Sequence, residues 1–473
     1  MKRRILIYNW IPFDDSSQKG GGVSVYVKNL INALIKTQKW DVYFLSSGRA
    51  YDINQYRVFI EPTQNSYSPY CKSFQVVNSP VLAAANLSLP YPHISNTDEV
   101  LKAVLGDFIF NNRIDVVHFQ NLEGLSVKVL ELKQRFPSVK FIYSIHNYYL
   151  VCPQVMFWRV ENEKCERNDD GIACVNCVPK DVHHSKIILN QCINYYASKG
   201  ETCSGLIGIK NAVEKYYQAY EKEQGKKWDQ NREFLIYEFR RFREQNVEYA
   251  NKFFDHMLAV SKRTSDIMVE HGIQPDKINV CYIGTEIAGM QRGNQSCMFD
   301  GGFFHICYMG YMRKMKGFFF FLDALEQMAE PLSMKMEVTI AALIEDEAVL
   351  ARIEKLREKF HKIMVYQGYT HFDLPNMLGN VHLGIVPALW EDNLPQVAIE
   401  MQAHGVPVLC SDCGGAKELH NNDAFVFKAN DVNDMISKLS KIIENPALFA
   451  DYWRNAMTLV TMEAHIRELQ NYY

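Results

Sequence analysis

Hydrophobic and polar positions divide most of the chain into short apolar runs and longer segments with helical spacing. Several apolar runs show no polar alternation, which is typical of parallel strands that are covered on both faces. The clearest runs lie at residues 4–8, 114–119, 141–145, 304–309, 337–341 and 381–387. Because two separate successions of strand and helix occur, the pattern predicts an α/β fold with two Rossmann-like domains.

The run at residues 381–387 begins the most informative part of the chain. A polar loop follows it, Asn393 and Pro395 signal the start of a short helix, and Gly405 signals its end before an apolar strand at 406–411. In such a unit the loop leaves the carboxyl end of the strand, and the N-terminus of the helix faces the same crevice. Its free N–H groups are suited to an anion or a hydroxyl-rich ligand.

Acidic residues surround this loop and helix. Asp392 lies in the loop beside Glu391, and Glu400 lies inside the helix. A carboxylate suits a vicinal diol because its two oxygens accept two hydrogen bonds side by side. A solvated helix in an ordinary α/β protein also explains such acids. What favours a site is their combination, within one short window, with a buried strand, a Gly-Val-Pro-Val segment from Gly405 and a Gly-Gly pair at 414–415.

This window, residues 381–419, resembles the donor-site signature of glycosyltransferase family 4, retaining enzymes of the GT-B fold. In that signature two acids with seven residues between them precede a small-residue helix, a Gly-x-Pro-Val strand and a Gly-Gly turn. Asp392 and Glu400 have this spacing, although the first acid of the family is usually Glu. The resemblance implies that Glu391 or Asp392 holds sugar hydroxyls and that Glu400 accepts the ribose hydroxyls. The implied donor-binding residues here are Glu391, Asn393, Leu394, Pro395 and Glu400, and Asp392 is assigned to catalysis.

The resemblance extends to other loops. Gly21 and Gly22, in a glycine-rich turn before a helical pattern, match a pair that lines the cleft near donor phosphate and acceptor. His146 matches a residue that faces the donor sugar, and Gly368 precedes a tyrosine in the segment that lies against the nucleobase. We therefore predict a catalytic role for His146 and donor-binding roles for the three glycines.

A cationic loop opens the second domain. Lys316 matches the family's lysine that binds the donor diphosphate, and Arg313 replaces the usual arginine, where this chain has Tyr311. A cation is needed there because the leaving nucleotide diphosphate gains charge in the transition state. The chain contains no Asp-x-Asp. We therefore expect Lys316, Arg313 and a helix N-terminus to replace a divalent cation, so that catalysis requires no cofactor.

Four cysteines lie in a polar segment at residues 152–177. Four thiolates complete a tetrahedral zinc site, and two ligands spaced as in Cys-Val-Asn-Cys often begin one. Two interpretations stay open. One is a structural zinc site, in which His183 or His184 could replace one of the cysteine ligands. The other is four unrelated reduced cysteines in a variable loop. The predicted ligands are Cys152, Cys165, Cys174 and Cys177.

A helical insertion follows at about residues 186–254, with apolar and aromatic residues at helical spacings among many charges. A helical pair that packs on the first domain explains it. The alternative is a basic, aromatic face for an anionic membrane or a lipid-linked acceptor. That face consists of Tyr216, Tyr217, Tyr220, Lys226, Lys227, Trp228, Arg240 and Arg241.

Composition limits the function classes. The 473 residues fit two domains with an insertion, and a net charge of −3 with no nucleic-acid motif argues against a nucleic-acid partner. No apolar run reaches the ~18 residues that a membrane span needs, and the first residues lack the features of a signal peptide. We expect a cytoplasmic protein with thiol or metal-bound cysteines. Association with the cytoplasmic face of a membrane stays open.

Together these features predict a GT-B protein with two facing domains and a cleft between them. Residues 1–285 form the N-terminal, acceptor-side domain, 286–302 the hinge, 303–455 the nucleotide-sugar-binding domain, and 456–473 a helix that returns to the first domain. By resemblance, the chain is a retaining, hexosyltransferase-type glycosyltransferase that acts on a glycan or lipid-linked glycan in bacterial surface polysaccharide synthesis. The alternatives are a nucleotide-sugar epimerase of the same fold and a catalytically weak donor-binding scaffold.

Overall fold

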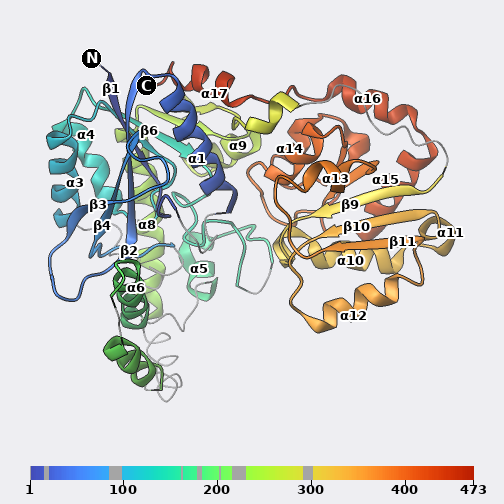
Figure 1. Ribbon diagram of the computed structural model, residues 1–473, viewed down its shortest axis with the longest axis horizontal. Helices are drawn as coiled ribbons and strands as arrows, with labels where there is room; N and C mark the ends of the chain where they lie inside the picture. The colour runs from blue at the N-terminus through green and yellow to red at the C-terminus, as the bar shows by residue number, and fades with distance from the viewer. Residues whose placement is uncertain are drawn as a thin grey trace. The chain divides into compact units, whose positions relative to one another are not determined.

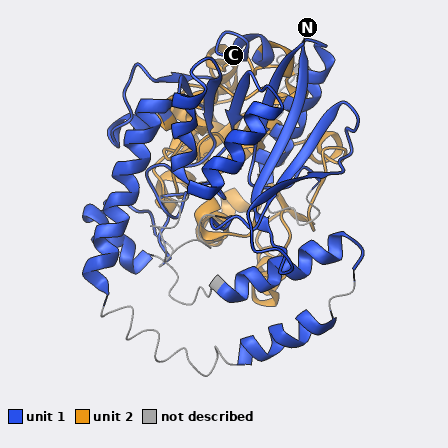
Figure 2. Cartoon of the chain, turned by 90° about the vertical axis from the view of Figure 1, so that its left-hand side faces the viewer, with its two compact units in different colours: residues 1–260, 265–281, 465–473 blue, residues 261–264, 282–464 orange. Residues whose placement is uncertain are grey.

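The computed structural model describes residues 2–14, 21–84, 99–160, 163–177, 184–201, 204–215, 231–290 and 302–473. The chain divides into two compact units (Figure 2). Unit 1 comprises Met1–Val260, Ser265–Cys281 and His465–Tyr473, and unit 2 comprises Ser261–Thr264 and Tyr282–Ala464. The chain thus leaves unit 1 a few residues before the predicted hinge at 286–302. Residues 286–290 of that hinge form the short helix η4 (Glu286–Met290), and 291–301 lie outside the described residues.

Unit 1 is built on an eight-stranded sheet with the order β3-β4-β2-β1-β5-β6-β7-β8 (Figure 1). Neighbouring strands are parallel except for β3 and β4, which are antiparallel. The apolar part of β1 is fully buried, with Ile5, Leu6 and Ile7 at 0% exposure, as its unbroken run requires. The strands are β1 (Arg3–Tyr8), β2 (Trp40–Ala50), β3 (Phe59–Thr63), β4 (Cys71–Val77), β5 (Val116–Phe119), β6 (Lys140–Ile145), β7 (His256–Ala259) and β8 (Ile278–Val280).

Helices accompany this sheet. α1 buries Tyr26, Val27, Leu30, Ile31 and Leu34, which form one stripe at helical spacing. The described helices, including the short 3-10 helices η2 and η3, are α1 (Gly21–Lys36), α3 (Glu99–Asn111), η2 (Val127–Glu131), α4 (Leu132–Arg135), η3 (Asp169–Gly171), α5 (Ile172–Cys177), α6 (His184–Ser198), α8 (Arg232–Phe253), α9 (Lys262–Glu270) and α17 (Met462–Leu469).

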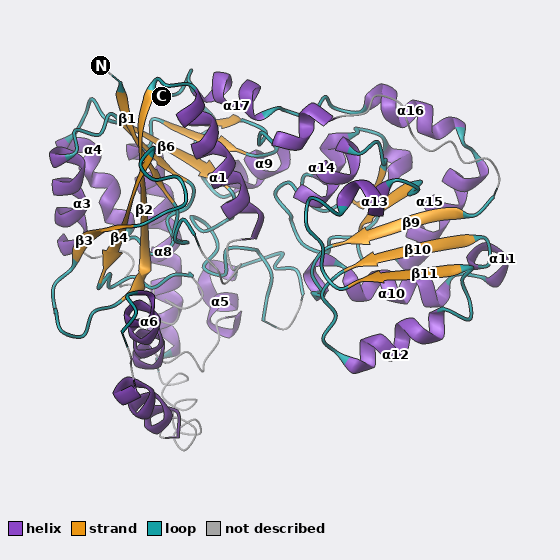
Figure 3. Ribbon diagram, viewed as in Figure 1, coloured by secondary structure: helices purple, strands orange, loops and turns teal. Residues whose placement is uncertain are grey.

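Unit 2 contains a six-stranded, fully parallel sheet with the order β11-β10-β9-β12-β13-β14 (Figure 3). This is the doubly wound order, in which the chain reverses direction across the sheet between β9 and β12. Ligands of such sheets bind outside the carboxyl ends of the strands at this switch point. The strands are β9 (Phe304–Met309), β10 (Met336–Ala341), β11 (Lys362–Tyr366), β12 (Leu383–Val386), β13 (Val408–Ser411) and β14 (Val426–Phe427).

The apolar runs of the sequence did not predict β14. This strand has two residues, too few for a periodic signal, and it forms because it pairs with Cys410 and Ser411 of β13. The helices of unit 2 are η5 (Lys314–Lys316), α10 (Phe318–Gln327), α11 (Glu330–Ser333), α12 (Glu347–Leu356), α13 (Leu374–Leu378), α14 (Gln396–Ala403), η6 (Ala416–Leu419), η7 (Asp423–Phe425), α15 (Val432–Glu444) and α16 (Ala447–Asn455).

Residues 465–473 belong to unit 1, although the run before them, Tyr282–Ala464, belongs to unit 2. The Oη of Tyr473 lies 2.8 Å from Nδ1 of the buried His118, and Nε2 of His465 lies 2.7 Å from Oη of Tyr26. Arg3 donates to the carbonyl oxygen of Tyr473 at 3.3 Å. These contacts fasten the returning segment to the core of unit 1. In the part of the chain that the structure describes, no helix is long and apolar enough to cross a membrane.

Candidate functional site

The loops at the switch point of unit 2 bring together residues that are far apart in sequence. Lys316 lies in η5, in the loop after β9, and Asp392 lies in the loop after β12. Lys316 Nζ is 2.6 Å from Asp392 Oδ2, and it also lies 5.1 Å from the ring centroid of Trp390. Asp392 is 7% exposed. Two of the predicted catalytic residues therefore form one partly buried ion pair at the edge where ligands of this fold bind.

Glycines let these loops approach each other backbone to backbone. Gly317 has a φ of +77°, and a Cβ at this position would lie 1.7 Å from the carbonyl oxygen of Pro387. Gly414 has a φ of +73°, and its Cβ would lie 2.1 Å from the carbonyl oxygen of Asp392. No other residue fits either position without a shift of the backbone. Gly317, which follows Lys316, and Gly414, in the Gly-Gly pair at 414–415, thus set the shape of the site.

The two neighbouring acids have different partners. Arg263 donates from Nη2 to Oε1 of Glu391 at 3.0 Å and from Nε to Oε2 at 3.1 Å, and the N–H of Gly414 donates to Oε2 at 3.0 Å. Such a bidentate, buried arrangement holds the Glu391 carboxylate in place. Asp392 instead faces Lys316. Of the two acids, Asp392 is therefore the one that accompanies the cation of the site, and Glu391 shapes the loop.

Glu400 lies one turn into α14 and is 7% exposed. Its carboxylate is 3.1 Å from Nε2 of His371 and accepts a long hydrogen bond of 3.5 Å from Oη of Tyr369. Burial and the neighbouring Glu400 raise the pKa of Tyr369. The sequence did not identify His371 or Tyr369 as neighbours of Glu400. Gly368, just before them, has a φ of +82°, and no atom lies within 4 Å of the place that a Cβ would occupy there.

The remaining residues of the predicted donor set have distinct positions. Asn393, Leu394 and Pro395 are buried where the loop enters α14, and Pro395 is its N-cap. Arg313, at the N-cap of η5, is exposed, with its guanidinium 5.4 Å from the ring centroid of Tyr311. The structure thus places Arg313 on the surface of the loop. It lies beside Tyr311, the position at which the family usually has the arginine that Arg313 was predicted to replace.

The His371–Glu400 pair predicts a pH dependence of stability. The hydrogen bond to Glu400 raises the pKa of His371 above its ordinary value of 6.5. The pair therefore contributes stability that is fully present below the unfolded pKa and is lost as the pH rises through the raised folded pKa. We expect His371→Asn to lower the urea midpoint of unfolding at about pH 5 and to leave it unchanged at about pH 9.

Glu400→Gln serves as the partner control for this measurement. It should remove the same pH-dependent contribution, and adding His371→Asn to it should cause no further pH-dependent loss. A His371→Asn protein whose midpoint follows that of the natural chain at every pH would show that the pair does not stabilise unit 2.

Unit 1 gathers polar side chains at its own switch point, between β1 and β5. His146 follows β6. Its Nε2 lies 2.9 Å from Oε1 of Gln120, and its ring centroid is 4.9 Å from that of Tyr26. Desolvation, with a smaller effect of His465, lowers the pKa of His146 to about 3. The imidazole is therefore neutral at physiological pH, so that it acts as a hydrogen-bonding group rather than as a cation. Gly21 and Gly22 form the first residues of α1, and Gly21 has a φ of +50°.

The four cysteines of the predicted zinc site line one small pocket in unit 1, together with Arg243. Arg243 donates to the sulfur of Cys174. Cys174 and Cys177 lie on α5, so the prediction of a loop throughout 152–177 is wrong there. Among the described residues, no three of these sulfur atoms lie within 4.8 Å of one another. Zinc at Cys152, Cys165, Cys174 and Cys177 stays a prediction.

Much of the proposed membrane-facing surface lies outside the described residues, namely Tyr216, Tyr217, Tyr220, Lys226, Lys227 and Trp228. Arg240 and Arg241 lie on α8, where Arg240 is 3.5 Å from a carboxylate oxygen of Asp170. His183, the alternative zinc ligand, is also outside the described residues, and His184 begins α6.

The two parallel-sheet, Rossmann-like domains define the GT-B fold, and known proteins agree with this assignment. Residues 296–458 match the family model of Glycosyl transferases group 1. Among curated proteins, none matches the chain in sequence.

Three solved structures illustrate the similarity in fold. Sucrose-phosphate synthase from Thermosynechococcus elongatus is 16% identical with a TM-score of 0.58, over 99% of this chain and 98% of that one. HepE from Anabaena, in complex with UDP, is 13% identical with a TM-score of 0.55, over 100% of both chains. The apo form of WaaB, a lipopolysaccharide outer core galactosyltransferase, is 11% identical with a TM-score of 0.54, over 100% of this chain and 99% of that one. At such identities the likeness establishes the fold.

Proposed function

We propose that this chain is a retaining glycosyltransferase of the family 4 type that transfers a hexose from a nucleotide-diphosphate-sugar donor to an acceptor hydroxyl. The observation that carries the proposal is the Lys316–Asp392 ion pair at the switch point of unit 2. The match of residues 296–458 to Glycosyl transferases group 1 supports it. So do the structures of HepE with UDP and with UDP-glucose, which suggest a UDP-sugar as the first donor to test.

Lys316 has the central electrostatic role in this mechanism. Donor binding places the diphosphate against its ammonium group and against the N–H groups at the start of α10, which follows directly after Gly317. As the bond to the sugar breaks, the leaving diphosphate gains negative charge, and a fixed cation stabilises that charge without reorganisation. Because the diphosphate replaces Asp392 as the partner of Lys316, the Asp392 carboxylate becomes available to accept a hydrogen bond from a sugar hydroxyl.

Glu400 recognises the nucleoside. Its two carboxylate oxygens accept the two ribose hydroxyls, while His371 and Tyr369 hold the carboxylate in place. The acceptor hydroxyl attacks the sugar from the same face from which the leaving group departs. An oxygen of the departing phosphate takes the proton of this hydroxyl. The role we propose for His146 is that of a neutral hydrogen-bonding group. No divalent cation takes part in these steps.

The acceptor we propose is a glycan or lipid-linked glycan of a bacterial surface polysaccharide, reached from the cytoplasmic face of the membrane. The similarity in fold to WaaB, a lipopolysaccharide outer core galactosyltransferase, supports this class of acceptor.

A donor screen tests the proposal. Purified protein is incubated with UDP-, GDP- and ADP-sugars in EDTA, and nucleotide release and thermal stabilisation are measured. We expect one donor to bind and to be hydrolysed slowly without metal. Binding with no release, even when an acceptor glycan is added, would favour a donor-binding scaffold, and a product that is an isomeric nucleotide sugar would identify an epimerase.

Glu400→Gln is the variant that tests nucleoside recognition. A hydrogen bond to a charged group is worth about 1.5–3 kcal/mol, so we expect donor and free nucleotide to bind about 10- to 150-fold more weakly. Calorimetric titration with the nucleotide diphosphate measures this change directly. Glu358→Gln, at an exposed position after α12, is the matched control and should bind as the natural chain does. Equal affinities in both variants would remove Glu400 from the site.

A further inference from the structure

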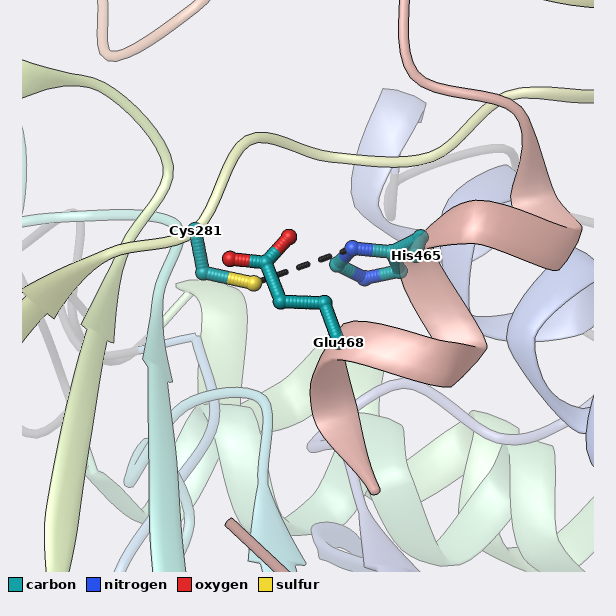
Figure 4. Close-up of side chains that lie close together, drawn as sticks. All are labelled: Cys281, His465 and Glu468. Carbon is teal, nitrogen blue, oxygen red and sulfur yellow. Dashed lines mark hydrogen bonds between the residues drawn. The ribbon is translucent and has the colours of Figure 1, made fainter. Parts of the chain in front are cut away.

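Three side chains that the proposed function does not use converge in unit 1 (Figure 4). Cys281 directly follows β8, and His465 and Glu468 are three residues apart on α17, so that they share one face of that helix. Each offers one metal-ligand atom, and these atoms all lie within 4.8 Å of one another. Cys281 is 3% exposed and His465 is 2% exposed. Among the described residues, this is the one group of three or more such side chains with this spacing.

The spacing of the ligand atoms fits a tetrahedral metal ion. Cys281 Sγ and His465 Nδ1 are 3.7 Å apart. With a zinc–sulfur bond of about 2.3 Å and a zinc–nitrogen bond of about 2.0–2.1 Å, the tetrahedral angle places the two atoms about 3.6 Å apart. A thiol–imidazole hydrogen bond also spans 3.7 Å, so the separation alone does not distinguish the two arrangements.

The charges of the three ligands match a divalent ion. A thiolate from Cys281 and the carboxylate of Glu468 together carry two negative charges, and a neutral imidazole adds none. A divalent cation makes the set neutral, which suits a largely buried position because an uncompensated charge there is costly. The sulfur, nitrogen and oxygen ligands are those that zinc accepts together.

The second nitrogen of His465 is already held. Nε2 lies 2.7 Å from Oη of Tyr26, a residue of α1 that is 3% exposed. Metal-bound histidines commonly have such a partner at the other ring nitrogen, because it fixes the tautomer and the orientation of the ring. Here the partner leaves Nδ1 directed at the sulfur of Cys281, as Figure 4 shows.

We propose that Cys281, His465 and Glu468 bind one zinc ion that fastens α17 to the end of β8. Binding replaces the thiol proton of Cys281, which is released to solvent, and the fourth position of the tetrahedron belongs to a water molecule or to the second oxygen of Glu468. The site is structural. It lies where the chain leaves unit 1, after Cys281, and where it re-enters unit 1, at His465.

Cobalt titration of the full chain tests this site separately from the four-cysteine pocket. The background is the variant Cys174→Ser/Cys177→Ser, freed of metal by dialysis against a chelator. We expect one cobalt ion per chain and a near-ultraviolet thiolate-to-cobalt charge-transfer band, which Cys281→Ser abolishes. Cys307→Ala, at a buried cysteine of β9, is the matched control and should retain the band. A folded background protein without the band, or a band that survives Cys281→Ser, would overturn the proposal.

Glu468→Gln provides a second test that does not depend on the fold of the cysteine variants. Glu468 is only partly buried, so the substitution is expected to leave the fold intact. We expect it to weaken cobalt binding more than about tenfold, since even partners outside the first coordination sphere have effects of that size. Zinc content per chain, measured by mass spectrometry after purification without chelator, should fall in parallel. Unchanged cobalt affinity and zinc content in Glu468→Gln would contradict the proposal.

Discussion

Replacing Lys316 by methionine is expected to lower kcat for sugar transfer by about 10²- to 10³-fold, the effect of removing one preorganised charge-stabilising group from a transition state. Methionine keeps most of the length and volume of lysine but has no charge. Because Lys316 Nζ lies 2.6 Å from Asp392, the substitution also leaves that buried carboxylate without its cation. Steady-state rates with saturating donor and acceptor measure the change.

Lys314→Met is the control for this prediction. Lys314 belongs to the same short helix, η5, but is exposed, and no ion pair of Lys314 is found among the described residues. We expect its kcat to remain within about twofold of that of the natural chain, as for most surface substitutions. Equal losses of kcat in the two variants would mean that the total positive charge of the loop matters and that the position of Lys316 does not. An unchanged kcat in Lys316→Met would exclude Lys316 from leaving-group stabilisation.

Gly317→Ala is expected to destabilise unit 2 by about 2–5 kcal/mol. About 1–2 kcal/mol comes from a side chain in the left-handed backbone region, and about 1–3 kcal/mol comes from overpacking. The added Cβ would lie 1.7 Å from the carbonyl oxygen of Pro387, so the loops after β9 and β12 must separate. Urea unfolding followed by tryptophan fluorescence measures the loss of stability. Donor binding measures the effect of separating the loops on the site.

Gly368→Ala separates the two contributions. Gly368 has nearly the same backbone conformation, with a φ of +82°, but open space surrounds its Cβ position. It should therefore show only the backbone cost of about 1–2 kcal/mol. If the two alanine variants unfold at the same urea concentration, the contact between Gly317 and Pro387 does not constrain the loops.

The strands and most helices could be predicted because their signals are local. The run at 304–309 is apolar apart from His305 and forms β9 with the same ends. Pro395 and Gly405 mark the ends of α14 correctly, because an N-cap and a left-handed residue after a helix have specific backbone requirements. β14 was missed since its two residues gain their strand conformation from pairing alone.

The candidate site could be predicted only in part, because local patterns mark only some of its residues. Lys316, Asp392 and Glu400 are found by motif spacing along the chain. The partners that position these groups come from elsewhere, because Arg263 reaches Glu391 across 128 residues and His371 reaches Glu400 across 29. No local pattern marks an arginine or a histidine whose partner is set by sheet order. Cys281 and His465 are also far apart in the sequence, so no local pattern indicated the proposed metal site.

The discontinuity of unit 1 makes its core depend on two distant parts of the chain. Unit 2 is almost entirely one continuous run, Tyr282–Ala464, whereas unit 1 also includes residues 465–473. The buried side chains of His118 and Tyr26 obtain the partners Tyr473 and His465 from that segment. A chain cut between Ala464 and His465 would therefore keep nearly all of unit 2 but would leave buried polar groups of unit 1 without these partners.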